Sequence, residues 1–131
     1  MSNLEFAKIM QGRTKAFAVQ IIKFYGKMPS TEESRVLGRQ LLRAATSVAA
    51  NYRAVSRSKS YADFVHKLGT VVEEVDETLL WFELLEGAGL VAESKISSLK
   101  SEAGELLRIL QTSLHTAENK RAENPRARKS S

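Results

Sequence analysis

The chain has 131 residues, of which 43% are apolar and 27% charged, and its formal net charge is +5 at pH 7. This length is typical of one domain that buries a self-sufficient core. The absence of cysteine excludes a disulfide framework, a thiolate nucleophile and cysteine-based zinc or iron–sulfur sites.

The first of four predicted helices runs from Leu4 to about Lys27. Apolar residues recur there at spacings of three and four, and Gly26 followed by Pro29 ends the pattern. The predicted core stripe of this helix comprises Phe6, Ile9, Met10, Phe17, Ile21 and Phe24.

The second and third helices are predicted from the same spacing and from hydroxyl caps. The second begins after Ser30 or Thr31 and runs to about Ser56; its stripe is Leu37, Leu41, Ala44, Val48, Tyr52 and Val55. The third begins after Ser58 or Ser60 and ends near Glu86; its stripe is Phe64, Leu68, Val71, Val72, Val75, Leu79 and Phe82.

The last predicted helix is capped near Glu93 or Ser94 and has the most regular heptad spacing of the chain. Its stripe is Ile96, Leu99, Ala103, Leu106, Leu110, Ser113 and Ala117. Residues 119–131 lack apolar periodicity and are predicted to be a disordered basic C-terminal tail. The fold class is therefore predicted to be all-α, with residues 1–118 forming an antiparallel up-and-down four-helix bundle.

Charge is unevenly distributed along the chain. Residues 1–60 hold eleven Lys and Arg against three acids, whereas residues 61–118 hold four against eleven. On the second helix, an arc of roughly 80° and about 33 Å long, opposite the apolar stripe, contains five arginines. They are Arg35, Arg39, Arg43, Arg53 and Arg57.

Two interpretations of this arginine stripe remain open. A helix face opposite the core is normally polar, and arginine is a good helix former. However, no acid occurs between Glu33 and Asp63, although mixed charges would relieve repulsion on a solvated face. The stripe then indicates an anionic partner, either DNA or RNA or the acidic third helix of another subunit.

The third helix carries a candidate oligomer interface on the side away from its core stripe. Near its end, residues 79–85 are apolar nearly all round, whereas a monomeric bundle needs only one apolar stripe. The interface candidates are Asp63, Glu73, Glu74, Glu77, Trp81 and Leu84. Trp81 either anchors this interface or covers the end of its own bundle.

No catalytic, cofactor or metal site is predicted. A di-iron bundle needs two Glu-x-x-His pairs, and Asp63 with His66 is the single near match. The chain lacks a phosphate-binding glycine loop and any pairing of a nucleophile with a base. We therefore expect a non-enzymatic protein without cofactors. We also expect a cytoplasmic protein with no membrane contact, since no signal peptide or membrane-length apolar run is present.

Residues 42–51, LRAATSVAAN, together with Asp63-Phe64 and residues 67–69, resemble a known family. These are the bacterial four-helix bundle proteins named after intervening sequences in 23S ribosomal RNA genes, and the resemblance covers about residues 4–117. Many members continue after the asparagine with Ile-Ala-Glu-Gly, whereas Tyr52 and Arg53 follow Asn51 here. This departure indicates a different branch.

The resemblance implies a small bundle without catalytic residues. Related accessory proteins of diversity-generating retroelements form basic pentamers that bind nucleic acid and a reverse transcriptase. The resemblance therefore implies a homopentamer and favours Arg39, Arg43 and Arg53 for anion binding. Two hypotheses follow: an oligomer that binds nucleic-acid backbones, or an adaptor whose arginines contact acidic residues of neighbouring subunits and whose client is another protein.

Overall fold

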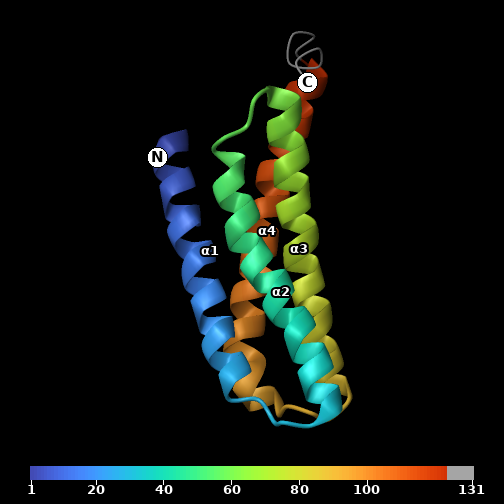
Figure 1. The fold of residues 1–131 in the computed structure, drawn as a ribbon. Coiled ribbons are helices and arrows are strands. Elements are labelled where there is room, and N and C mark those ends of the chain that lie inside the picture. The colour runs from blue at the N-terminus through green and yellow to red at the C-terminus, as the bar shows by residue number, and fades with distance from the viewer. Residues whose placement is uncertain (124–131) are drawn as a thin grey trace.

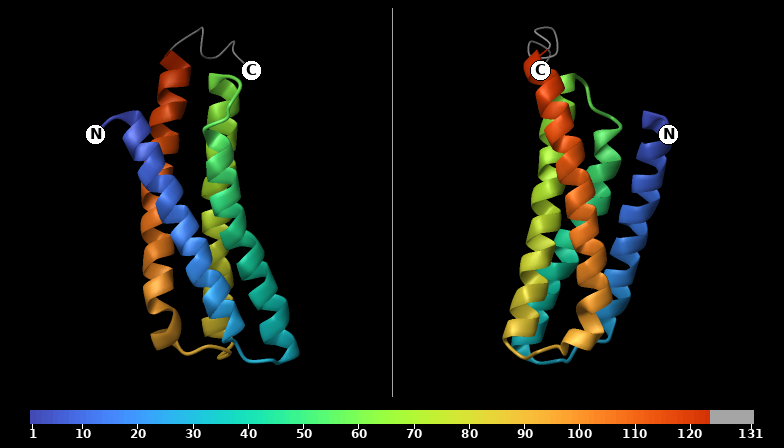
Figure 2. Two further views of the ribbon diagram at one scale, coloured as in Figure 1. Left: turned by 60° about the vertical axis from the view of Figure 1, so that its left-hand side comes forward. Right: turned by 180° about the vertical axis from the view of Figure 1, so that it is seen from behind.

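The computed structural model describes residues 1–123, which form four α-helices and no strand. The helices are α1 (Asn3–Gly26), α2 (Glu32–Val55), α3 (Tyr61–Gly87) and α4 (Glu93–Glu123). Successive helices run in opposite directions and are joined by short loops at the two ends of the bundle (Figures 1 and 2). This confirms the predicted all-α, up-and-down four-helix bundle.

Hydroxyl side chains cap the first three helices. The side-chain oxygens of Ser2, Thr31 and Ser60 each accept a hydrogen bond from the third backbone amide that follows, at 3.1, 3.3 and 3.0 Å. Thr31 and Ser60 were each one of two predicted alternatives. By contrast, α4 begins at Glu93 directly after Ala92, so its cap position has no side-chain acceptor.

Most of the predicted stripe residues face the core, but Ile9 does not. The inner face of α1 is formed by Met10, Thr14, Phe17 and Ile21, which recur at spacings of four and three. Ile9 lies about 100° from Met10 around the helix and is 51% exposed, so its predicted place in the core was wrong.

One fork-shaped ion pair links α1 to α4. Nε and Nη2 of Arg13 donate to the two carboxylate oxygens of Glu102, both at 2.8 Å, and Nη2 also lies 3.3 Å from Glu105. The hydrogen bonds from Arg13 to Glu102 are the main cause that holds the pKa of the guanidinium above its ordinary value.

The helix α4 continues to Glu123, five residues past the predicted end of the bundle at 118. Lys, Arg, Ala and Glu in residues 120–123 are good helix formers, and Lys120 and Arg121 lie at the C-terminal end, where the helix dipole favours cations. The start of the predicted tail at 119 was therefore placed too early. The remainder of that tail, 124–131, lies outside the described residues.

Candidate nucleic-acid interface

The predicted arginines lie on the solvent side of α2 and just beyond its end. Arg35, Arg39 and Arg53 are helical and exposed. The helix ends at Val55, so Arg57 lies in the following turn, where its amide donates to the carbonyl of Ala54 at 3.0 Å. The prediction that α2 carries all five arginines in one helical stripe was wrong for Arg57.

Arg43 differs from the other four arginines because it binds acids of its own chain. Its Nη2 donates to Oε1 of Glu77 at 2.9 Å, and its Nη1 lies 3.7 Å from Oε2 of Glu74. Its Nε donates to the side chain of Gln40 at 3.2 Å. Arg43 therefore joins α2 to α3 within one bundle.

The other four arginines keep their charge available to a partner. Among residues 1–123, no carboxylate lies within 4.0 Å of their guanidinium groups, and all four residues are exposed. They are Arg35, Arg39, Arg53 and Arg57. We call these four residues the free arginines.

Glu74 occupies an unfavourable position between α2 and α3. Its side chain is 17% exposed, and its Oε2 is buried without a hydrogen-bond partner among the described residues. Burial raises the pKa of Glu74 above its ordinary value of 4.5, the negative charge of Glu77 raises it further, and Arg43 acts in the opposite direction. Ionised Glu74 therefore costs the folded chain free energy.

At neutral pH we expect Glu74→Gln to raise the free energy of unfolding by about 1 kcal/mol, because it removes a buried, poorly bonded charge. The pKa of Glu74 is higher in the folded than in the unfolded chain. The destabilisation caused by ionised Glu74 is thus complete above the pKa that Glu74 has in the folded chain. It disappears as pH falls toward 4.5. Urea unfolding at neutral pH and near pH 4.5 measures both effects.

The control for this prediction is Glu73→Gln, which removes a charge at the neighbouring, exposed position of the same helix. We expect this variant to unfold like the wild type at both pH values. A loss of stability on Glu74→Gln at neutral pH would contradict the prediction, because it would mean that attraction to Arg43 outweighs the cost of burial.

The remaining predicted acids lie at separate places along α3. Asp63 belongs to the first turn, where it accepts from the backbone amide of Lys59 at 3.0 Å and from Nζ of Lys67 at 2.7 Å. The bond from Lys67 is the main cause that lowers the pKa of Asp63. Glu73 is exposed. The structure thus groups Glu74 and Glu77 around Arg43 but places Asp63 in the first turn of α3, next to the cap residue Ser60.

Apolar side chains are exposed at the other end of the α2–α3 face. Leu80 is 45% and Leu84 41% exposed, and Trp81 is half-buried against the core with an indole N–H that has no acceptor among residues 1–123. Arg43 bonds to Glu77 and α2 and α3 run antiparallel, so counting seven residues along each helix brings Val36, which is 43% exposed, to the level of Leu84. We call Val36, Leu80, Trp81 and Leu84 the apolar patch.

Of this patch, Val36 was not predicted, and Leu80 was included in the apolar run 79–85 but not among the interface candidates. Val36 does not follow the spacing of the core stripe of α2, and Leu80 adjoins the predicted interface residue Trp81. The positions of Val36 and Leu80 outside the core stripes can be read from the sequence. Whether the two residues lie near each other depends on how α2 and α3 align.

The structure of residues 1–123 also bears on metal binding and on membrane crossing. Within residues 1–123, no three His, Asp or Glu side chains are arranged so that they could share a metal ion. In the same range, no helix combines the length and apolar character that a membrane crossing requires.

Comparison with known proteins agrees with the bundle architecture. The family described as 23S rRNA-intervening sequence protein matches residues 8–112. A crystal structure of a protein of unknown function from the S23 ribosomal protein family of Bacteroides thetaiotaomicron is similar, with a TM-score of 0.77 and 28% identity. The match covers 83% of this chain and 97% of that one. No curated protein matches the chain. Since the family match spans most of the bundle, the chain belongs to the 23S rRNA-intervening sequence protein family.

Proposed function

We propose that this protein is a non-enzymatic, cytoplasmic homo-oligomer that binds DNA or RNA through the phosphate backbone. The observation that carries the proposal is the set of four free arginines on and beside one face of α2. Their guanidinium groups match phosphate oxygens in charge and geometry. The name of the family, which refers to 23S rRNA, supports including RNA among the ligands tested.

Oligomer formation would raise the affinity for nucleic acid above that of a single subunit. Each subunit presents one row of free arginines, so a ring of subunits presents several rows to one strand or duplex. The apolar patch on α2 and α3 provides the contact surface of the proposed oligomer. Five subunits are the number that the family resemblance implies.

Fluorescence anisotropy of labelled duplex and single-stranded DNA and RNA, across a salt series, tests the proposed binding. We expect Arg39→Glu together with Arg53→Glu to weaken binding at least about tenfold and to reduce the slope of log affinity against log salt by about 2. Measurements on the whole chain and on residues 1–123 separate the bundle from the basic residues that follow it.

A matched control reverses two exposed cations that lie on another helix. Lys8→Glu with Lys15→Glu makes the same change in net charge on α1 and is expected to leave most of the affinity intact. Equal losses for the two double variants would contradict a specific role for α2. Loss of all binding in residues 1–123 would assign nucleic-acid binding to the last eight residues alone.

The alternative is a structural or adaptor protein whose client is another protein. The exposed apolar patch favours this candidate, because apolar residues at such a site match a protein surface better than they match phosphates. In this case the free arginines contact acidic residues of neighbouring subunits. Arg39→Glu with Arg53→Glu would then dissociate the oligomer, and nucleic acid would bind weakly through the basic residues after the bundle.

A further inference from the structure

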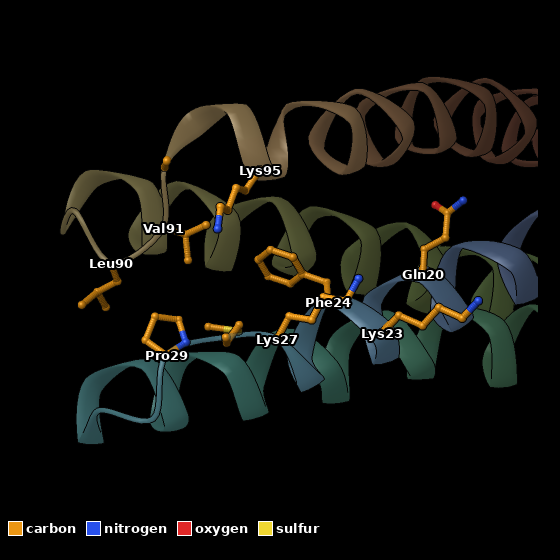
Figure 3. Close-up of a pocket in the computed structure, with 10 residues that line it drawn as sticks. Gln20, Lys23, Phe24, Lys27, Pro29, Leu90, Val91 and Lys95 are labelled. Carbon is orange, nitrogen blue, oxygen red and sulfur yellow. The ribbon is translucent and has the colours of Figure 1, made fainter.

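A pocket lies at the end of the bundle that holds the α1–α2 and α3–α4 loops (Figure 3). It is formed by the last turns of α1, by both loops and by the first turn of α4, and its volume is about 680 Å³. Pockets that bind small molecules have volumes of roughly 300 to 1,000 Å³. The size of this pocket therefore fits a small molecule.

The floor of the pocket is apolar and attached to the core. It is lined by Phe24, Met28, Leu90 and Val91. The Phe24 ring packs edge-on against the fully buried Phe82, with ring centroids 6.3 Å apart and an interplanar angle of 70°. Val91 is 8% exposed. These contacts hold the floor in shape without a ligand.

The rim of the pocket is basic. In the view of Figure 3, Lys27 at the end of α1 and Lys95 of α4 lie on opposite sides of the Phe24 ring, whereas the Lys23 side chain extends away from the ring, toward the side of Gln20. No acidic residue lines the pocket. Among residues 1–123, no carboxylate lies within 4.0 Å of any of these three ammonium groups.

We propose that this pocket binds an amphipathic carboxylate, a molecule with an alkyl chain and one carboxylate group. The alkyl chain would pack on the apolar floor, and the carboxylate would lie between Lys27 and Lys95. An apolar body together with an anionic group matches both halves of the lining, whereas a fully polar anion would leave the floor exposed to water. This site is separate from the free arginines, so it goes beyond the proposed nucleic-acid binding.

Dodecanoate, kept below its micelle concentration, is the probe for this site. Backbone amide NMR shifts of the whole chain are expected to change saturably at Phe24, Met28, Leu90 and Val91. Lys27→Gln together with Lys95→Gln is expected to weaken binding at least about tenfold, because it removes two charge-assisted contacts to the carboxylate. The variant spectra also report whether the bundle remains folded.

Two controls make the result specific. Lys8→Gln with Lys15→Gln removes the same charge from exposed positions of α1 and is expected to change the affinity less than about twofold, since distant charges are screened. Dodecyltrimethylammonium has the same chain but a positive head and is expected not to bind. Any of three outcomes would overturn the proposal: no saturable shift with dodecanoate, equal binding of the cation, or shifts centred on Leu80 and Leu84.

Discussion

Leu84→Arg is expected to dissociate the proposed oligomer while leaving the helical content of each chain unchanged. Leu84 is 41% exposed in the single bundle, so a longer charged side chain can extend into solvent there. In a subunit interface, the same charge would be buried beside Leu80 and Trp81 without a partner. We expect a loss of more than about 2 kcal/mol per contact, or about thirtyfold in the dissociation constant. Sedimentation velocity and circular dichroism measure the two quantities.

Leu4→Arg is the matched control for this experiment. Leu4 is also an exposed leucine, at 67%, but it lies in the first turns of α1 and outside the apolar patch. We expect this variant to keep the subunit number of the wild type. Dissociation by Leu4→Arg with no effect of Leu84→Arg would place the interface on α1. A wild type that sediments as a monomer would remove the oligomer from the proposed function.

Gly38→Leu is expected to lower the stability of the bundle by roughly 2 kcal/mol and its Tm by about 8 °C. Gly38 is buried where α2 passes the end of α1. A Cβ atom at this position would lie 3.0 Å from Sδ of Met28 and 3.0 Å from the Tyr25 ring. A leucine therefore fits only if the side chains of Met28 and Tyr25 are displaced from their packed positions. Thermal unfolding followed by circular dichroism gives the Tm.

Gly12→Leu provides a control with the opposite expected sign. Apart from its chain neighbours and the backbone of its own helix, nothing among residues 1–123 lies within 4 Å of the position of a Cβ at Gly12, which is exposed in the middle of α1. Leucine favours the helix over glycine by about 0.8 kcal/mol, so this variant is expected to be more stable than the wild type. Destabilisation of the same size by both substitutions would refute close packing at Gly38 as the cause.

The helices and much of the core could be predicted from the sequence because both depend on local spacing. Phe17, Leu41, Val75 and Phe82, for example, were predicted for the core and are fully or almost fully buried. Local spacing predicted the ends of the helices less reliably than their core faces. The carbonyl of Val55 accepts from the hydroxyl of Ser58 at 2.6 Å, in the turn that leaves Arg57 outside α2.

The candidate site was predicted only in part because its details depend on contacts between helices. The charge of Arg43 looks identical to that of Arg39 in the sequence, but only Arg43 lies beside Glu74 and Glu77 of α3. The pocket was not predicted at all. Its lining combines two loops that are about 60 residues apart in the chain, and no local pattern brings them together.

The exposure of Leu4 and Ile9 has a consequence for the motions of the bundle. The first two turns of α1 bury little apolar surface, whereas the inner face of α3 includes the fully buried Val71, Val75 and Phe82. The free energy of local opening follows the apolar surface that each segment buries. We therefore expect the start of α1 to open locally while the other three helices stay packed, and amide hydrogens there to exchange with solvent sooner than those of α3.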